Sequence, residues 1–303
     1  MNTTDVKLKE LRSGPVTWRE RLYRYALLVR LNKPIGILLL MWPTLWALWI
    51  AGQGQPPWQV VLVFMLGVAL MRSAGCAIND FADRKIDGHV SRTQQRPIAT
   101  GLVSAREAVM VFLILSLLAF LLLFFLNWQT MALSVIAVIL AAAYPFMKRY
   151  TYFPQVVLGA AFGWAVPMAF MAVTESLPPV AWVVFAATLL WALIYDTQYA
   201  MVDREDDLRI GVKSTAILFG HRDLLIIGIL QVIMLALLVV MGLMSGRGWI
   251  YYAGLVVGGG FFVYQQVISL ERDPKACFEA FLNNNHFGMG VFLGLMLDYA
   301  IIG

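Results

Sequence analysis

Long apolar stretches are the feature that most constrains how this chain can fold. Nine of them have roughly the 17–25 residues that cross a bilayer as a helix. They cover about residues 35–51, 58–78, 107–126, 130–147, 154–173, 180–200, 223–244, 249–269 and 286–302. Helices satisfy the backbone of an open chain in lipid, and the strict alternation of a membrane β-barrel is absent. We therefore predict an all-α integral membrane protein with nine transmembrane helices in one bundle.

The composition excludes a soluble enzyme. Of the 303 residues, 60% are hydrophobic and 14% are charged, whereas soluble domains have about 45–50% and about 25%. So large an apolar excess cannot be buried in one soluble core, and most of it must face lipid. No linker or change in composition divides the chain. Residues 1–303 are therefore expected to form one domain, with a polar cytoplasmic segment at residues 1–33.

The basic residues indicate how the chain is oriented. If the nine stretches cross the bilayer in turn, 22 of the 23 Lys and Arg residues fall on one side, with Arg72 just inside the second stretch, and Arg247 remains on the other. Loops rich in Lys and Arg stay in the cytoplasm. We therefore expect a cytoplasmic N-terminus and a periplasmic C-terminus. The net charge of +5 is assigned to this bias, so membrane lipid is the expected partner and nucleic acid is not.

Two acidic segments lie on the predicted cytoplasmic side and hold eight of the 18 acidic residues. The first contains Asp80, Asp83 and Asp87. At about 100° per residue, these side chains fall within roughly 60° of one another if the second helix continues past residue 79. They are then expected to project from one face of that helix.

The second acidic segment follows the sixth apolar stretch. By the same helical period, Asp196, Asp203 and Asp207 fall within about 40° of one another, with Tyr199 at the edge of the stripe. Stacked carboxylates repel each other, and ionisable residues beside a membrane usually mark function. Carboxylate oxygens suit Mg²⁺, which bridges to substrate phosphates. The two stripes therefore predict a Mg²⁺ site for an anionic substrate.

Basic residues accompany both stripes, although the positive-inside bias alone would place many of them there. Carboxylates with Mg²⁺ and neighbouring Lys or Arg can hold a diphosphate. The basic residues near the stripes are Arg30, Lys33, Arg84, Lys85, Arg92, Arg96, Lys148, Arg149, Arg204, Arg209 and Lys213. Of these, we expect Arg84, Lys85 and Lys213 to contact phosphate directly.

The acidic segments also carry a family resemblance. Asn79 to Asp87 matches the pattern NDxxDxxxD of the UbiA-type membrane prenyltransferases, and the run from Tyr195 to Asp207 resembles their second Asp motif. Further similar segments are residues 31–36, 88–101, 144–151 and 211–215. The resemblance covers nearly the whole chain. Within the family, these segments are similar to the bacterial branch that prenylates 4-hydroxybenzoate in ubiquinone synthesis.

This resemblance implies a fold, a reaction and a location. The fold is a nine-helix bundle in the bacterial inner membrane, around a central cavity that the two motif loops cap on the cytoplasmic side. The reaction is the Mg²⁺-dependent transfer of a polyprenyl chain from polyprenyl diphosphate to a ring carbon of 4-hydroxybenzoate, with release of diphosphate. The implied metal ligands are Asp80, Asp83, Asp87, Asp203 and Asp207, and the implied diphosphate contacts are Asn79, Arg84, Lys85 and Lys213.

The acceptor of such a reaction carries a carboxylate that must be oriented. Arg149 is our choice for its partner, because a guanidinium grips a carboxylate through two hydrogen bonds. Asp196 either hydrogen-bonds the acceptor phenol or accepts a proton, or it joins the metal ligands. Tyr195 and Tyr199 are expected beside the acceptor. Together with Tyr144, they either stabilise an allylic cation or belong to the interfacial aromatic belt.

Two alternatives follow from the same residues. One is a prenyltransferase of the same fold that uses a dihydroxynaphthoate, homogentisate or haem acceptor. The other is a secondary transporter in which the Asp residues bind ions. Transporter sites tend to lie near the membrane midplane, whereas these acids cluster at one membrane face beside basic residues. This position favours an anionic headgroup and therefore the transferase.

Overall fold

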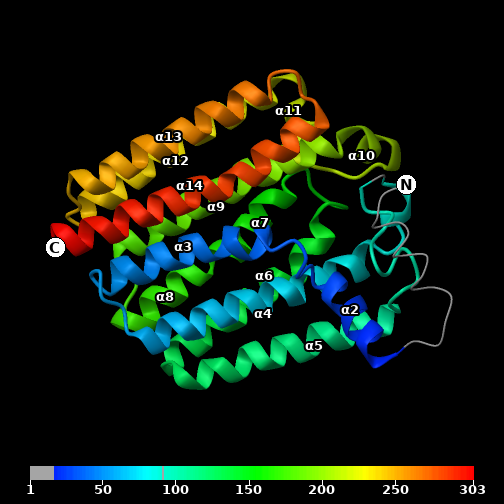
Figure 1. The fold of residues 1–303 in the computed structure, drawn as a ribbon, viewed down its shortest axis with the longest axis horizontal. Coiled ribbons are helices and arrows are strands. Elements are labelled where there is room, and N and C mark those ends of the chain that lie inside the picture. Colours follow the sequence, from blue (N-terminus) through cyan, green and yellow to red (C-terminus); the bar gives the residue numbers. More distant parts are fainter. Residues whose placement is uncertain (1–16, 91) are drawn as a thin grey trace.

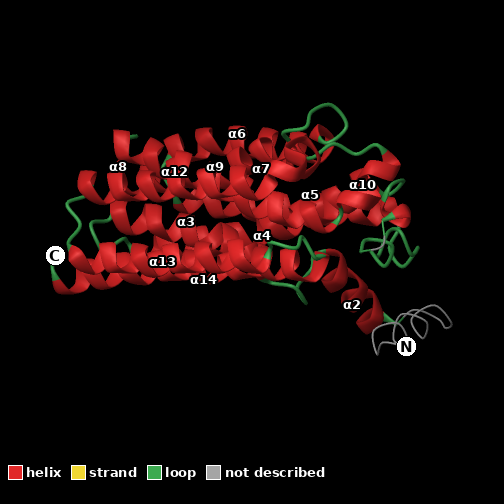
Figure 2. Cartoon of the chain, turned by 90° about the horizontal axis from the view of Figure 1, so that it is seen from above, coloured by secondary structure: helices red, strands yellow, loops and turns green. Residues whose placement is uncertain are grey.

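The computed structural model of the chain describes residues 17–90 and 92–303, and every regular element in those ranges is helical. The first 16 residues of the predicted polar segment 1–33 lie outside the described residues. Figure 1 shows long helices that lie side by side in one bundle, and Figure 2 shows the same bundle from above as stacked helical layers. The prediction of an all-helical fold is confirmed for this part of the chain.

Ten helices build the bundle. They are α3 (Ile35–Ala51), α4 (Trp58–Asp83), α5 (Ala105–Leu122), α6 (Trp128–Met147), α7 (Pro154–Gly163), α8 (Ala165–Thr174), α9 (Pro179–Val202), α12 (Asp223–Met244), α13 (Trp249–Ile268) and α14 (Pro274–Ile301). Short elements connect or flank them. These are α2 (Trp18–Leu28), α10 (Arg204–Ile210), α11 (Thr215–Phe219) and the 3₁₀ turns η1 (Asp87–His89), η2 (Leu123–Phe125) and η3 (Gly220–Arg222).

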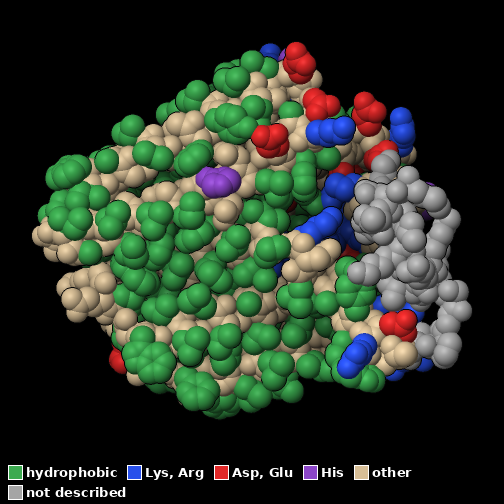
Figure 3. Space-filling model, in the orientation of Figure 1, with side chains coloured by type: hydrophobic (Ala, Val, Ile, Leu, Met, Phe, Trp, Pro, Cys, Tyr) green, Lys and Arg blue, Asp and Glu red, His purple; other side chains and the backbone are tan. Residues whose placement is uncertain are grey.

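Six helical segments of the described residues are long and apolar enough to cross a membrane. They are Trp58–Asp83, Ala105–Phe125, Trp128–Met147, Pro154–Thr174, Pro179–Val202 and Thr215–Met244. α3 is also apolar but shorter, with 17 residues. Figure 3 shows hydrophobic side chains over most of one face of the bundle, while Lys, Arg, Asp and Glu gather toward one end. This surface suits a bundle surrounded by lipid.

The last helix starts earlier than predicted, at Pro274 rather than at residue 286. Asp273 caps this end, because its carboxylate accepts hydrogen bonds from the backbone N–H groups of Lys275 and Ala276 at 3.0 Å each. An Asp before a Pro is a helix-start signal, whereas the prediction followed hydropathy alone. Asn284 in the added part is fully buried, so polar side chains there face other helices.

The fifth predicted stretch forms two helices, because α7 ends at Gly163 and α8 begins at Ala165. Pro167 explains the break. Its nitrogen carries no hydrogen for the carbonyl of Gly163, four residues earlier, and its ring clashes with that carbonyl. α7 reaches the polar end of the bundle, where it contributes Gln155 to the site described below.

A chain of buried amides holds α9 against α13 and α14. Trp191 Nε1 donates to Asn284 Oδ1 at 2.9 Å, Asn284 Nδ2 donates to Gln198 Oε1 at 2.8 Å, and Gln198 Nε2 donates to Gln265 Oε1 at 3.1 Å. Buried amides that satisfy one another specify how membrane helices pack. The chain therefore fixes the rotation of α9, which carries Asp196 into the cavity.

Candidate functional site

A cavity of about 1180 Å³ opens within the bundle. Many of its polar side chains come from α4, α6, α7 and α9 and from the segments that follow α2, α4, α6 and α9. Among them are Arg30, Arg72, Asn79, Asp80, Asp83, Asp87, Arg92, Arg96, Tyr144, Lys148, Gln155, Tyr195, Asp196, Tyr199, Asp203, Asp207 and Lys213. All five predicted metal ligands therefore line one cavity, although they come from two segments far apart in the chain.

The first three carboxylates meet in a way the sequence did not predict. α4 ends at Asp83, and Asp87 lies in the separate turn η1, so the prediction of one continuous helix face is wrong. The side chains converge because the chain turns back. Arg96 Nη1 lies 2.9 Å from Asp87 Oδ1, 3.4 Å from Asp80 Oδ1 and 3.7 Å from Asp83 Oδ2. One guanidinium therefore gathers all three.

Further cations balance this acidic cluster. Arg30 Nη2 lies 2.7 Å from Asp80 Oδ1, and Lys148 Nζ donates to Asp83 Oδ2. Asp80 is fully buried and Asp83 is 1% exposed. Buried carboxylates are costly unless they are paired, so these ion pairs explain how the acids are tolerated. Asn79 adds a weaker contact, because its Nδ2 donates to Asp83 Oδ2 at 3.3 Å.

The second acidic segment also leaves its helix before the acids end. α9 stops at Val202, Asp203 follows it, and Asp207 lies in α10, so the predicted continuous stripe is wrong here too. Asp196, Asp203 and Asp207 nevertheless all line the cavity. The helix break changes how the three carboxylates reach the site but keeps them in it.

Arg92 links the two acidic segments across the cavity. Its Nε donates to Asp203 Oδ1 at 2.9 Å, and its Nη1 donates to the Tyr199 hydroxyl. The Arg92 guanidinium carbon also lies 4.1 Å from the centre of the Tyr199 ring, a cation–π contact. The loop after α4 and the end of α9 are therefore tied together at the site.

The carboxylates fit a hard divalent cation in part. Asp80 Oδ2 and Asp83 Oδ1 are buried and have no hydrogen-bond partner among the described residues. Carboxylate oxygens of this kind are the ligands that Mg²⁺ prefers. Within residues 17–90 and 92–303, however, no three acidic, His or Cys side chains already surround one point. Asp80, Asp83, Asp87 and Asp203 are instead each paired with an Arg or Lys side chain.

Outside the long helices, two carboxyl groups of the acidic motifs have raised pKa values. Burial raises the pKa of Asp87 to about 6, helped by the charges of Asp83 and Asp80 and opposed by Arg96. Burial and then the charge of Asp203 raise the pKa of Asp207 to about 7. Both groups therefore lie where their charge is poorly compensated, and a bound cation would stabilise their ionised forms.

Three predicted contacts do not reach the cavity. Arg84, Lys85 and Arg149 are exposed and do not line it. The Arg84 guanidinium instead lies 4.2 Å from the centre of the Phe81 ring. Arg149 Nη2 donates to the Ala82 carbonyl at 2.6 Å. The assignments of these residues to diphosphate or acceptor stay predictions that the geometry does not support.

The remaining predicted residues do line the cavity. Tyr195 and Tyr199 contribute from α9. Lys213 also lines it, but its Nζ donates to the Tyr150 carbonyl at 3.3 Å. Tyr199 packs against Phe281, with ring centres 4.7 Å apart. The aromatic rings of Tyr199 and Phe281 therefore lie next to the charged residues that line the cavity.

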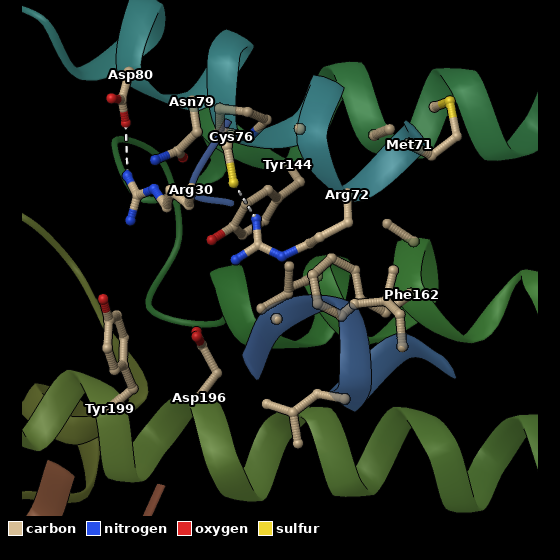
Figure 4. Close-up of a pocket in the computed structure, with 18 of the residues that line it drawn as sticks. Arg30, Met71, Arg72, Cys76, Asn79, Asp80, Tyr144, Phe162, Asp196 and Tyr199 are labelled. Carbon is tan, nitrogen blue, oxygen red and sulfur yellow. Dashed lines mark hydrogen bonds and ion pairs between the residues drawn. The ribbon is translucent and has the colours of Figure 1, made fainter. Parts of the chain in front are cut away.

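Sequence reasoning missed Arg72, which lies within α4. Its Nη1 donates to Cys76 Sγ at 2.7 Å, its guanidinium carbon lies 6.0 Å from the centre of the Phe162 ring, and its Nε is buried without a partner among the described residues. Figure 4 shows Arg72 projecting into the cavity, with Asp196 pointing up from α9 below it. An ionisable residue inside an apolar stretch is itself a functional signal, so the sequence contained this clue.

Apolar side chains also line much of the cavity. Its walls include Leu39, Val63, Phe64, Val68, Phe120, Leu123, Leu126, Phe162 and Met168. The arrangement therefore suits a molecule with an anionic head and a long apolar tail. A cationic and acidic cluster at one end of such a cavity, inside a bundle of apolar helices, defines a membrane protein that binds a lipid-like anion.

Residues 40–290 match the UbiA prenyltransferase family, and the chain belongs to that family. It is 59% identical over 281 residues to an Enterobacter sp. protein named 4-hydroxybenzoate octaprenyltransferase, covering 93% of this chain and 97% of that relative. A protein of the same name from Alkalilimnicola ehrlichii is also 59% identical, over 285 residues, with 94% and 97% covered. The predicted family is thus confirmed.

The fold is similar to that of solved UbiA homologues. The apo structure from Aeropyrum pernix K1 has a TM-score of 0.76 and 24% identity, covering 86% of this chain and 97% of that one. The structure from Archaeoglobus fulgidus bound to GPP and Mg²⁺ has a TM-score of 0.66 and 20% identity, covering 89% and 99%. These likenesses show that the chain has the fold of the family.

Proposed function

We propose that this chain transfers a polyprenyl chain from polyprenyl diphosphate to the ring of 4-hydroxybenzoate, with Mg²⁺, in ubiquinone synthesis. The observation that carries the proposal is the cavity, which joins a buried cluster of carboxylates and basic side chains to an apolar channel. Family membership and the names of the relatives support prenyl transfer and this acceptor.

The metal is assigned to the two acidic segments. Asp80, Asp83, Asp87, Asp203 and Asp207 would hold Mg²⁺, which when bound neutralises the charge that develops on a departing diphosphate. The two unpartnered oxygens at Asp80 and Asp83 support this assignment. The homologue structure that contains Mg²⁺ together with GPP also supports it.

The diphosphate is assigned to basic side chains that now pair with the carboxylates. Arg30, Arg92, Arg96 and Lys148 all line the cavity, and each contacts an Asp. Phosphate oxygens are strong acceptors for guanidinium and ammonium groups. These four residues replace Arg84 and Lys85 as our proposed contacts, while Asn79 and Lys213 remain candidates from within the cavity.

The prenyl chain is assigned to the apolar part of the cavity. Phe120 on α5 and Val138 on α6 line it while 44% and 47% of their surface stays exposed. These exposures support an opening of the cavity toward the outer surface of the bundle near α5 and α6. A long prenyl chain can extend from here into the surrounding lipid, which avoids the need to enclose the whole chain.

The acceptor carboxylate is assigned to Arg72 rather than to Arg149. Arg72 offers the buried and unpartnered Nε inside the cavity, whereas Arg149 lies outside it. Asp196 lines the same cavity from α9. An acceptor that carries a carboxylate at one end and a phenol at the other suits this pair of residues.

Bond breaking and bond making then follow from these positions. The bond between the prenyl carbon and the diphosphate oxygen breaks, and its electron pair leaves with the diphosphate. The ring carbon beside the phenolic carbon bonds to the prenyl carbon and then loses its proton, for which Asp196 is the proposed acceptor. Tyr144, Tyr195 and Tyr199 supply aromatic surface that can stabilise positive charge and exclude water.

The same proposal includes the topology. We propose a single domain that crosses the bacterial inner membrane nine times. The spans, in order, are α3, α4, α5, α6, α7 with α8, α9, α12, α13 and α14. The loops that carry the acidic motifs would cap the cavity on the cytoplasmic side, with the N-terminus in the cytoplasm and the C-terminus in the periplasm. The distribution of Lys and Arg supports this orientation.

The proposal is tested with purified protein in lipid nanodiscs. With Mg²⁺, a polyprenyl diphosphate and 4-hydroxybenzoate, we expect prenylated acceptor and free diphosphate in equal amounts. Acceptors compete in the same assay, with dihydroxynaphthoate and homogentisate as rivals. Preferential prenylation of either rival would assign the chain to another branch of the family.

A further inference from the structure

We infer that Gly36 determines acceptor specificity by leaving space for the Arg72 guanidinium. The inference rests on the proposed function, because it assigns a task to the residue that faces the acceptor-binding arginine. Gly36 is buried, lies in the first turn of α3 and lines the cavity. No side chain of Gly36 separates the backbone of α3 from Arg72 on α4.

The close approach of the two helices leaves no space for a side chain at this position. A Cβ added to Gly36 would come closest to Arg72 Nε, and it would lie 2.5 Å from Arg72 Nη2 and 2.7 Å from Arg72 Cζ. Both distances are far below van der Waals contact. Glycine is a poor helix former compared with alanine, so helix formation gives no reason for glycine here. The position of the Arg72 guanidinium does explain the glycine, because a Cβ at residue 36 would clash with it.

The other contacts of Arg72 are compatible with the role of Gly36 as the residue that leaves space for its guanidinium. Cys76 Sγ accepts from Nη1, and the Phe162 ring lies near the guanidinium carbon. The atoms that a Cβ at Gly36 would meet are the far end of a flexible side chain rather than backbone. An added methyl group is therefore accommodated by moving the guanidinium, while the helices keep their positions.

A moved guanidinium changes which acceptors bind well. Two hydrogen bonds to a carboxylate need the planar group in one place, and a misplacement of about 1 Å can cost on the order of 100-fold in rate. An acceptor without a carboxylate loses nothing when this group moves. Gly36 is therefore a positioning residue that favours carboxylate acceptors over neutral phenols.

The test compares Gly36→Ala with wild type in the full-length protein. We expect the KM for 4-hydroxybenzoate to rise about 10-fold or more, and the KM for prenyl diphosphate to stay within about twofold. The preference for 4-hydroxybenzoate over neutral 4-hydroxybenzamide should fall by a similar factor. Gly260→Ala on α13 is the matched control, because a Cβ there meets nothing within 4 Å and the residue does not line the cavity.

Arg72→Lys separates failure of this inference from failure of the acceptor assignment. If Arg72→Lys leaves the KM for 4-hydroxybenzoate unchanged, the acceptor assignment is wrong and the inference falls with it. If Arg72→Lys raises that KM while Gly36→Ala behaves like Gly260→Ala, the role of Gly36 alone is overturned. A rise in both KM values in Gly36→Ala also overturns it, since general distortion of the cavity then explains the change.

Discussion

Several single residues at the site are both buried and charged. Asp83 illustrates this, because its carboxylate is buried against Lys148 and Asn79 while its Oδ1 has no partner among the described residues. A structural salt bridge alone would not leave a buried oxygen unsatisfied, since such an atom costs about 1–3 kcal/mol. This oxygen is therefore available to a further partner, and we propose that Mg²⁺ would be that partner.

Replacing this carboxylate tests the metal assignment. Asp83→Asn should lower the rate by about 100-fold or more at a fixed Mg²⁺ concentration, because loss of one well-placed charged group costs roughly 3–4 kcal/mol of transition-state stabilisation. Activity of the wild type should vanish with a chelator and return with Mg²⁺. Turnover is measured with each substrate saturating, and folded protein is quantified by gel filtration in detergent.

Glu271→Gln is the control for removing an acidic group. Glu271 is exposed and does not line the cavity, so its variant should keep wild-type activity. Near-normal turnover of Asp83→Asn at every Mg²⁺ concentration would remove Asp83 from the proposed metal ligands.

Arg149 gives a second test at the scale of one residue. The structure places it outside the cavity, where its Nη2 donates to the Ala82 carbonyl. Arg149→Lys keeps the charge and should change the KM for either substrate by less than about threefold, since exposed charges contribute about 0–1 kcal/mol. A selective rise in the KM for acceptor would restore the assignment made from the sequence.

At the scale of helices, periodicity and hydropathy predicted much of the architecture. α3 and α12 have the bounds expected from their apolar runs. The ends facing the site were less predictable, because α4 and α9 both stop before their acidic motifs finish. Hydropathy marks what faces lipid. It does not mark where a helix gives way to a turn held by contacts elsewhere in the chain.

The partners of the acids were unpredictable for the same reason. Arg30 and Asp80 are 50 positions apart, Lys148 and Asp83 are 65 apart, and Arg92 is 111 positions from Asp203. A motif shows which carboxylates belong together, since local turns assemble them. It cannot show which basic side chain from a distant segment reaches them, so the sequence favours Arg84, which is close to the acids along the chain.

A buried carboxylate outside the cavity, that of Asp223, holds the elements around α10 together. Asp223 at the start of α12 is fully buried and accepts hydrogen bonds from Arg204 at the start of α10 and from Arg272 Nε at 3.0 Å. Asp223→Asn should lower the free energy of unfolding by about 2–3 kcal/mol. This is less than a fully buried pair would lose, because both arginines are partly exposed to solvent. Thermal unfolding in detergent measures the loss.

Glu205→Gln on α10 is the comparison, because Glu205 lies next to Arg204, one of the two partners of Asp223. The ion pair of Glu205 with Arg209 is 3.9 Å long, and both side chains are exposed, so the change in stability should stay within about 0.5 kcal/mol. Equal thermal stability of Asp223→Asn and Glu205→Gln would show that the buried cluster does not hold these elements together.

At the scale of the whole molecule, the end of the bundle where charged side chains gather is also the end where the described chain begins. Figures 1 and 2 place α2 and α10 at one end of the bundle and the C-terminal end of α14 at the other. The charged side chains visible in Figure 3 gather toward the end that carries α10. An odd number of crossings is needed to bring the chain from one end to the other. The arrangement therefore suits the nine spans that we propose.

Reporter fusions test this topology. A reporter fused after Gly246, between α12 and α13, should be active in the periplasm, whereas reporters after Arg92 or Lys275 should be active in the cytoplasm. The reason is the distribution of Lys and Arg, of which Arg247 alone falls on the predicted outer side. A cytoplasmic reporter at Gly246 would mean that an odd number of spans has been miscounted before α13. The proposed order of nine spans, and with it the periplasmic position of the C-terminus, would then fail.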